Sequence, residues 1–238
     1  MTQILYMNDI EGNYVKEFDA IVTKRKSDYV VLDQTAFYPL GGGQPSDIGY
    51  LEWDDKKVKV KEVIKKGDTV KHIIDGEKPL VGTKVHGLID WDKRYAHMKM
   101  HTAQHIISGI IFDNYNARTV GNQIHADYSR VDFHPVNLKD NDLELIKNKF
   151  NELVKQNLEI QIYEEDRESL ENRVDTQRAH LDLLPKFIKR LRIVEIKDFD
   201  VCPCAGTHVR NTNEIPEMKQ MKRETKGNDK TRIIYSLD

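Results

Sequence analysis

The chain has 238 residues, of which 39% are hydrophobic and 32% are charged, and its formal net charge is −2. This length supports one or two folded domains, no apolar run approaches the ~18 residues of a membrane helix, and the bulk charge does not indicate a nucleic-acid partner. The N-terminus shows no secretory signal, and two cysteines separated by one proline exclude a disulfide framework. We therefore expect a cytoplasmic protein whose reduced thiols can bind a metal ion.

The first part of the chain is predicted to be rich in β-strands. Short stretches of β-branched residues, bounded by glycine, aspartate and lysine, occur at residues 29–33, 58–64, 69–74 and 84–90. Several short strands at this spacing are typical of a small barrel.

A glycine-rich segment, T-A-F-Y-P-L-G-G-G-Q-P-S-D-I-G, follows the first of these strands at residues 35–49. Its three consecutive glycines, Gly41, Gly42 and Gly43, allow another molecule or a second domain to approach at backbone distance. The spacing matches neither a phosphate-binding loop nor a dinucleotide fingerprint. A plain turn between two strands is the alternative, and the polar neighbours Thr35 and Gln44 favour a binding role.

A change of pattern near residue 90 predicts a boundary between a domain at 1–90 and a second domain at 91–238. The segment 94–112 has the length of a helix and carries hydrophobic residues on neighbouring turns.

This predicted helix contains the sequence H-T-A-Q-H, from His101 to His105. A spacing of four residues places both imidazoles on one helix face, where two nitrogens can reach one metal ion. His97 lies one turn earlier, so any adjacent two of the three histidines can chelate. Thr102 stands where a zinc protease of the H-E-x-x-H type needs glutamate, which excludes that class.

The second domain is predicted to be α+β, with a mainly antiparallel sheet packed by helices. A second helix at 140–157 has apolar residues at spacings of three and four. Strands are expected at residues 129–133, 160–163, 191–196 and 231–235.

A second cluster of metal-binding residues lies near the end of the chain, in V-C-P-C-A-G-T-H-V at residues 201–209. A thiolate and the imidazole of His208 complete a nitrogen and sulfur set that suits Zn²⁺ better than Mg²⁺ or Ca²⁺. Cys202 and Cys204 compete for the metal, because strand alternation points both to the same side. The spacing C-x-x-x-H favours Cys204, and Cys202 is then an alternative ligand or a small buried hydrophobic residue.

Charge is unevenly distributed along the chain. Residues 138–172 carry ten acidic and five basic side chains, whereas residues 184–232 carry seven acidic and twelve basic ones. The second stretch can form a local surface for a phosphate backbone, and a solvated lysine-rich surface is the alternative.

The motifs H-T-A-Q-H and C-A-G-T-H, preceded by the glycine-rich segment, resemble the freestanding alanyl-tRNA editing proteins (the AlaX family). These proteins are similar to the editing domain of alanyl-tRNA synthetase. The resemblance covers nearly the whole chain and is greatest to the medium-length form. It implies a translation-protein-type β-barrel followed by an α+β editing domain. One departure from the family's pattern is Ala205, which replaces the first of two glycines after the cysteine.

The resemblance also implies a function. It implies an ATP-independent carboxylic ester hydrolase that deacylates mischarged alanine tRNA, chiefly the seryl ester and also the glycyl ester, acting in trans. One Zn²⁺ per chain is expected on the family's four ligand positions, which fall on His101, His105, Cys204 and His208. Four protein ligands are typical of a structural zinc, whereas a catalytic zinc usually keeps one position open, so either one ligand is loose or the coordination expands.

Other residues receive roles from the same resemblance and from the chemistry of the ester. Gln123 and Thr35 are expected to be catalytic, Gln123 by positioning water or substrate and Thr35 by hydrogen bonding to the seryl hydroxyl. Substrate-binding roles are expected for Gly41, Gly42, Gly43, Gln44 and Arg130. A seryl-tRNA editor for threonine tRNA and a non-catalytic, zinc-stabilised tRNA-binding module are the alternative functions.

Overall fold

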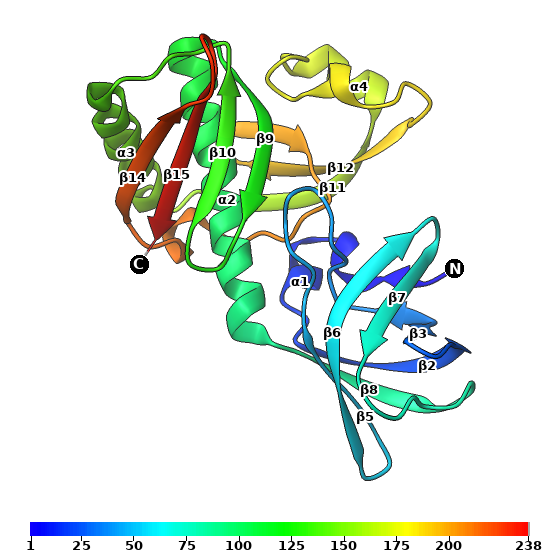
Figure 1. The fold of residues 1–238 in the computed structure, drawn as a ribbon. Coiled ribbons are helices and arrows are strands. Elements are labelled where there is room, and N and C mark those ends of the chain that lie inside the picture. The colour runs from blue at the N-terminus through cyan, green and yellow to red at the C-terminus, as the bar shows by residue number, and fades with distance from the viewer. Residues whose placement is uncertain (238) are drawn as a thin grey trace. The chain divides into compact units, whose positions relative to one another are not determined.

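The computed structural model describes residues 1–237 of the chain, which divide into two compact units, Met1–Tyr95 and Ala96–Asp238 (Figure 1). The division falls inside the long helix α2 (Trp91–Tyr115). Within the described part of the chain, no helix is long and apolar enough to span a membrane. The domains predicted at 1–90 and 91–238 remain predictions, since compactness alone does not show that either part folds or acts by itself.

Unit 1 is built around a closed six-stranded barrel in which every neighbouring pair of strands is antiparallel. The strand order is β2-β3-β7-β6-β5-β8. The barrel strands are β2 (Glu17–Arg25), β3 (Tyr29–Leu32), β5 (Gly49–Trp53), β6 (Lys56–Lys66), β7 (Thr69–Ile74) and β8 (Lys84–Ile89). The remaining elements of the unit are β1 (Gln3–Ile4), η1 (Leu5–Met7), α1 (Ile10–Asn13) and β4 (Gln34–Thr35).

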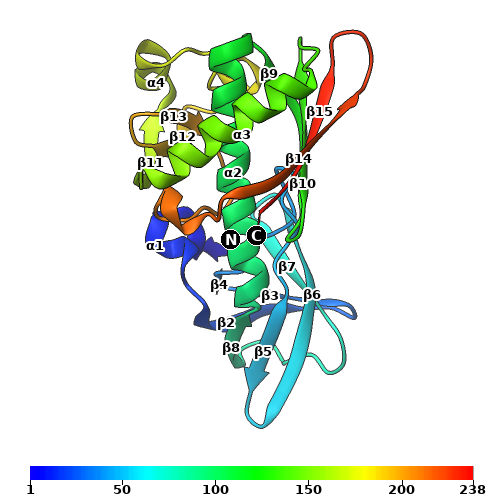
Figure 2. The same ribbon diagram turned by 90° about the vertical axis from the view of Figure 1, so that its left-hand side faces the viewer.

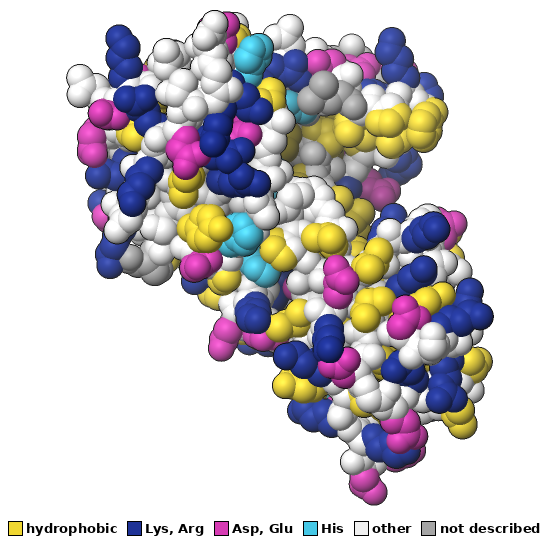
Figure 3. Space-filling model, viewed as in Figure 1, with side chains coloured by type: hydrophobic (Ala, Val, Ile, Leu, Met, Phe, Trp, Pro, Cys, Tyr) yellow, Lys and Arg dark blue, Asp and Glu magenta, His cyan; other side chains and the backbone are white. Residues whose placement is uncertain are grey.

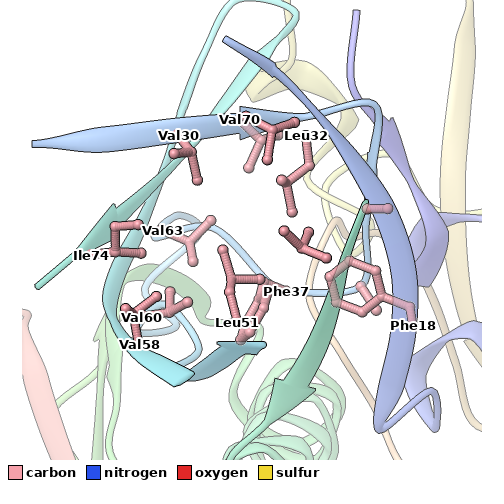
Figure 4. Packing of buried hydrophobic residues seen from close by; sticks show 14 of the residues in the cluster. Phe18, Val30, Leu32, Phe37, Leu51, Val58, Val60, Val63, Val70 and Ile74 are labelled. Atoms are coloured by element: carbon pink, nitrogen blue, oxygen red, sulfur yellow. The ribbon is translucent and has the colours of Figure 1, made fainter. Parts of the chain in front are cut away.

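The barrel interior is filled by alternate side chains from its strands. Valine, leucine and phenylalanine side chains of the buried cluster point toward the centre of the barrel from the surrounding strands (Figure 4). The predicted barrel is therefore confirmed, with strands at β3, β6, β7 and β8 close to their expected bounds. Two of its strands, β2 and β5, were not predicted. In β2 buried and exposed residues alternate, but lysine, arginine and aspartate on the exposed side weaken the sequence signal.

A buried ion pair anchors the glycine-rich segment to the rest of unit 1. The side chains of Arg94 and Asp47 are 0% and 1% exposed, and Arg94 Nε lies 3.0 Å from both carboxylate oxygens. The same guanidinium donates to the backbone carbonyls of Asn13 and Ala36 at 2.9 and 2.6 Å, and Asp47 accepts the Tyr38 amide at 2.6 Å. Because both ends of the glycine-rich loop are held in this way, its conformation is defined by buried polar contacts.

Unit 2 contains two antiparallel sheets, with α2 between them (Figure 2). The first has the order β14-β15-β10-β9 and the second β11-β12-β13. The strands are β9 (Arg118–Ile124), β10 (Ser129–His134), β11 (Ile160–Asp166), β12 (Arg190–Ile196), β13 (Asp200–Pro203), β14 (Met218–Thr225) and β15 (Thr231–Leu237). The other elements are α3 (Asp140–Lys155), α4 (Arg167–Arg173), η2 (Leu181–Leu183) and η3 (Thr212–Glu214).

The α+β class and the mainly antiparallel pairing are confirmed, although unit 2 has two sheets where one was expected. The helix α3 agrees with its prediction, and the Asp142 side chain accepts the Lys139 amide at 2.7 Å across its first turn. Strands β9, β13 and β14 were not predicted, because their polar and charged sequences lack an apolar alternation. Helix α2 is longer than expected, and sheets on both sides bury most of its circumference within unit 2.

The surface of the molecule mixes both signs of charge. On the face drawn in Figure 3, lysine and arginine side chains are interspersed with acidic ones on both units. The visible face therefore has no large area of a single charge sign, in agreement with the chain's small net charge.

Candidate metal centre

Four side chains from two distant segments meet in unit 2. His101 and His105 project from one face of α2, one turn apart, while Cys204 and His208 come from the segment that follows β13. One ligand atom from each residue lies within 4.8 Å of the other three, and the three histidines are buried. The structure thus brings together the four residues that the sequence nominated as a ligand set.

The spacing of these atoms can be tested against the needs of a metal ion. Cys204 Sγ lies 3.6 Å from His101 Nε2 and 3.4 Å from His208 Nε2. Ligand atoms placed tetrahedrally around zinc at ~2.0–2.3 Å are separated by about 3.3–3.8 Å. Both distances fall in that range, and three imidazoles with one thiolate form a borderline-soft donor set, so the residues fit a zinc ion.

The electrostatics of the cluster favour a thiolate at Cys204 and a neutral imidazole at His208. Burial raises the pKa of the Cys204 thiol, but the charges of His101 and His208 outweigh burial and hold this pKa well below its ordinary value. The Gly206 amide also donates to Cys204 Sγ at 3.3 Å, which stabilises a thiolate. Burial and the charge of His101 hold the pKa of His208 well below its usual range. A thiolate and a neutral imidazole are the forms that ligate.

Thr102 determines which nitrogen of His208 carries the proton. Its hydroxyl donates its single hydrogen to the Met98 carbonyl at 3.0 Å and accepts the Val209 amide at 3.3 Å. The remaining contact, 3.1 Å to His208 Nδ1, must then be donated by the imidazole. The lone pair of His208 is therefore at Nε2, the nitrogen that faces Cys204.

We expect the Thr102→Val variant to bind zinc about 10- to 100-fold more weakly, because the tautomer of His208 is no longer selected. The serine variant keeps the hydroxyl and should retain most of the affinity. Competition with a chelating dye measures both constants. Equal weakening in the two variants would assign the loss to packing instead of the hydrogen bond.

His105 is oriented from the other side by a chain of polar groups. Its Nδ1 lies 3.3 Å from Cys202 Sγ and 3.7 Å from Asp200 Oδ2, which leaves Nε2 for the four-residue cluster. Burial opposes the charge on His105, but the charge of Cys202 and the nearby carboxylate of Asp200 outweigh it and raise the pKa of His105 well above its usual value. Arg178 Nε in turn donates to Asp200 Oδ1 at 3.2 Å.

Gly109 allows this second layer to approach α2. A Cβ atom at this position would lie 2.8 Å from the Phe199 ring and 3.0 Å from the Arg178 guanidinium. A side chain here would therefore displace Arg178, which holds Asp200 behind His105.

The structure shows where His97 and Cys202 lie, the two residues whose part in metal binding the sequence left open. His97 is buried on α2 but lies outside the cluster of four. Cys202 faces Nδ1 of His105 and forms a second group with His105 and Asp200, while Cys204 belongs to the cluster.

A row of polar side chains extends from the cluster along α2 toward β9. Gln104 Nε2 donates to Ser108 Oγ at 2.8 Å, and Ser108 Oγ lies 2.8 Å from Thr119 Oγ1. Asn122 Nδ2 reaches Gln104 Oε1 at 3.4 Å. A bulge at Val120 turns Thr119 and Asn122 to the same side of β9. Ser108, Thr119 and Asn122 are partly exposed, so this row can meet a ligand.

Gln123 and Arg130 lie on the other face of the same sheet. They are cross-strand partners, and strand alternation turns both side chains away from the face on which Asn122 meets α2. The structure therefore does not bring Gln123 into the polar row beside the metal cluster. Both residues are partly exposed.

Thr35 lies in unit 1 and is fully buried. Its hydroxyl is 2.9 Å from His72 Nε2 and accepts the Phe37 amide at 3.2 Å. Burial lowers the pKa of His72 to about 4, so this imidazole is neutral at pH 7. Contact between Thr35 and a seryl hydroxyl therefore requires a rearrangement of the barrel.

The glycine-rich loop of unit 1 exposes Gly41 and Gly42, whereas Gln44 is buried. The Gly41 carbonyl accepts the Tyr38 hydroxyl at 2.8 Å and the Gln44 amide at 2.9 Å. Gly42 and Gly43 have φ values of 55° and 81°, which residues with a side chain rarely adopt.

Several site residues were missed from the sequence. Thr102, Gln104 and Ser108 surround the histidines, yet only tertiary contacts give them a function. Asp200 could have been found from the sequence. Its spacing of two residues from Cys202 and of four from Cys204 places all three on one side of an extended strand.

Two segments of the chain match models of known protein families. The family model for class II (A) tRNA synthetases matches residues 5–93, and the model for the second additional domain of threonyl and alanyl tRNA synthetases matches residues 191–234. The second range includes Cys204 and His208, whereas His101 and His105 lie between the two ranges.

Full-length relatives cover the whole chain. The alanyl-tRNA editing protein AlaX-M of Methanosarcina barkeri is 40% identical over 100% of this chain and 99% of its own length. The chain belongs to the AlaX family. The AlaX-M of Saccharolobus solfataricus is 39% identical with similar coverage. The alanine–tRNA ligase of Thermococcus kodakarensis is 36% identical, and the chain matches 26% of its length.

Proposed function

We propose that this AlaX-family protein hydrolyses the ester bond of mischarged alanine tRNA, acting in trans, chiefly on the seryl ester and also on the glycyl ester. The observation that carries the proposal is the cluster of three buried histidines, His101, His105 and His208, with the partly buried Cys204, whose spacing suits one zinc ion. Membership in a family of alanyl-tRNA editing proteins supports the choice of tRNA.

Hydrolysis of an aminoacyl ester requires alignment and charge stabilisation more than a strong nucleophile, because the ester is already activated. When bound, Zn²⁺ supplies a Lewis-acid charge beside the substrate. The protein's own groups prepare the site: Thr102 keeps the proton of His208 on Nδ1, and Asp200 and Cys202 hold the imidazole of His105 from behind. Because the imidazoles of His105 and His208 are already oriented, the protein does not have to reorient them when the substrate binds.

Discrimination against correctly charged tRNA presents a physical problem, because alanine is smaller than serine and fits any pocket that admits serine. A polar group that is satisfied by the seryl hydroxyl and left unpaired by alanine can separate the two. The Ser108 and Thr119 hydroxyls are suited to this role, since they are partly exposed and lie in the row that begins next to His105.

One assay tests the function and its alternatives. Seryl-tRNA of the alanine and threonine acceptors is incubated with the protein, with and without a chelator, and ester hydrolysis is followed. We expect chelator-sensitive hydrolysis of the alanine acceptor alone. Preference for the threonine acceptor would support a seryl-tRNA editor for threonine tRNA. Binding of tRNA without hydrolysis would support a zinc-stabilised binding module.

Two matched threonine variants locate the group that recognises serine. Thr119→Val removes a partly exposed hydroxyl, so we expect the rate on the seryl ester to fall about tenfold while the glycyl ester is nearly unaffected. Thr35→Val leaves the buried Nε2 of His72 without its partner, which should destabilise the barrel by about 1–3 kcal/mol and change both esters equally. A loss confined to the seryl ester in Thr35→Val would instead place serine recognition at Thr35.

The glycine-rich loop is proposed to contact the tRNA through Gly41, Gly42 and Gly43, while the buried Gln44 closes the turn through its backbone bond to Gly41. Gly43→Val forces a β-branched side chain to φ 81°, at a cost of about 1–2 kcal/mol, and should reshape the loop. We expect deacylation to fall while zinc content, measured by atomic absorption, stays unchanged. Normal deacylation in this variant would reduce the loop to a turn between strands.

Gln123 and Arg130 are proposed to contact the tRNA outside the metal cluster. Their shared face of the sheet is opposite to α2, which favours tRNA binding over the positioning of water. Arg130→Gln should therefore raise KM with little change in kcat.

A further inference from the structure

A tight turn in unit 2 presents an exposed aromatic side chain that the metal centre does not use. Phe187 is 81% exposed, more than any other large hydrophobic residue of the described chain except Met1. It lies with Lys186 at the middle of a turn closed by the Ile188 amide, which donates to the Pro185 carbonyl at 3.1 Å. Hydrophobic side chains are visible at the surface of unit 2 in the region of α4 (Figure 3). An aromatic ring in this position covers no core of its own.

A buried arginine holds the segment around this turn. The Arg167 guanidinium donates to the carbonyls of Pro185, Leu181 and Leu184 at 2.7, 2.6 and 3.1 Å, and its Nε pairs with Glu171 at 2.8 Å. Arg167 is only 7% exposed, so these bonds are shielded from water. Phe187 is therefore displayed on a preorganised turn.

Some of the carboxylates around the turn are held in ion pairs. The nearby carboxylate of Asp182 is held by Arg118 at 2.9 and 2.6 Å, and Glu171 is held by Arg167. Lys186 and Lys189 are exposed, and neither has an ion-pair partner among residues 1–237. Both lysines line a hollow of about 380 Å³ beside the turn. Lys189 also lines a second hollow with the exposed carboxylates of Asp166 and Glu168. The two lysines beside the exposed ring are therefore the part of this surface that suits a polyanion with aromatic bases.

The same segment adjoins the metal centre. Arg178 reaches Asp200, which lies behind His105, and Arg118 precedes Thr119 of the polar row. The Arg118 side chain ties β9 to the segment through Asp182. The turn and the cluster are thus connected through short chains of contacts within unit 2.

We propose that Phe187 stacks on an unpaired base of the tRNA substrate while Lys186 and Lys189 bind the adjoining phosphates. This inference rests on the proposed function, and it adds the surface that receives the nucleic acid. Stacking on an aromatic ring tolerates any base, and lysine binds phosphate without reading sequence, so the contact contributes affinity and orientation.

Binding of uncharged alanine tRNA, measured by fluorescence anisotropy, tests the stacking contact. Phe187→Ala should weaken binding about tenfold, and Phe187→Trp should restore it because a stacking face is retained. Phe187→Leu keeps an apolar side chain without a stacking face and should behave like the alanine variant. Leu80→Ala, which removes an exposed apolar side chain in unit 1, is the matched control and should bind normally. Wild-type affinity in Phe187→Ala, or equal losses in the alanine and tryptophan variants, would overturn the proposal.

The lysines are tested by the salt dependence of the same binding. Replacing both Lys186 and Lys189 by glutamine should reduce the slope of log K against log salt by about 1.4, or about 0.7 per phosphate contact on a single strand. An unchanged slope would remove the lysines from the interface. A change of oligomeric state in Phe187→Ala, seen by size-exclusion chromatography, would assign the ring to a contact between copies of the chain and overturn the proposal.

A small substrate separates this inference from the proposed function. Seryl-adenosine carries the ester without the rest of the tRNA, so Phe187→Ala should hydrolyse it at the wild-type rate while losing about tenfold in kcat/KM on seryl-tRNA. If the wild-type protein hydrolyses neither ester, the proposed function fails, whereas the anisotropy series still decides whether Phe187 binds RNA.

Discussion

Replacing Cys204 by alanine should abolish stoichiometric zinc binding and lower deacylation by more than 100-fold. Loss of an outer-shell partner of a metal ligand already costs about 10- to 100-fold, so loss of a direct ligand should exceed that range. The thiol is also the only sulfur donor of the four-residue cluster, and two imidazole nitrogens lie 3.4 and 3.6 Å from it. Metal content by atomic absorption and hydrolysis of seryl-tRNA measure the two effects.

Cys202→Ala is the matched control for this prediction. Cys202 is a thiol two residues away and faces His105 Nδ1, outside the cluster of four. We expect it to keep one zinc per chain and to lose about tenfold in activity, at the low end of the range for an outer-shell partner, because Asp200 still faces His105 Nδ1. Full zinc content and activity in Cys204→Ala, with loss of both in Cys202→Ala, would exchange the roles of the two cysteines.

Arg94→Met should destabilise unit 1 by about 3–5 kcal/mol, because it leaves the buried carboxylate of Asp47 without a counter-charge. The variant also removes the donors to the carbonyls of Asn13 and Ala36. Urea denaturation followed by tryptophan fluorescence, to which Trp53 in the barrel and Trp91 at the start of α2 both contribute, measures the loss.

A double variant separates the charge from the other contacts of Arg94. Asp47→Leu combined with Arg94→Met removes the uncompensated charge, so stability should recover in part. Recovery stays incomplete because the Tyr38 amide and two carbonyls have lost their partners. If Arg94→Met alone lowered stability by less than 1 kcal/mol, the ion pair would not be what holds the glycine-rich loop.

Some features of this protein were determined by local sequence. The spacing of His101 and His105 needs only a helix to bring both imidazoles to one face, and the correctly predicted barrel strands β3, β6 and β7 carry β-branched residues at adjacent or alternate positions. The segment from Cys204 to His208 is equally local, because a glycine turn returns the chain within four residues. Family membership also followed from these short motifs.

Tertiary structure decided the features that depend on contacts between distant segments. Strands β9 and β14 form because neighbouring strands supply hydrogen bonds, since their own polar sequences carry no signal. The bulge at Val120 sets which face Thr119, Asn122 and Gln123 occupy, and a one-residue shift exchanges those faces. Burial of Thr35 beside His72 likewise depends on closure of the barrel. Local sequence specified which groups can bind a metal, whereas long-range packing determined which groups orient them, because orientation comes from partners far away in the chain.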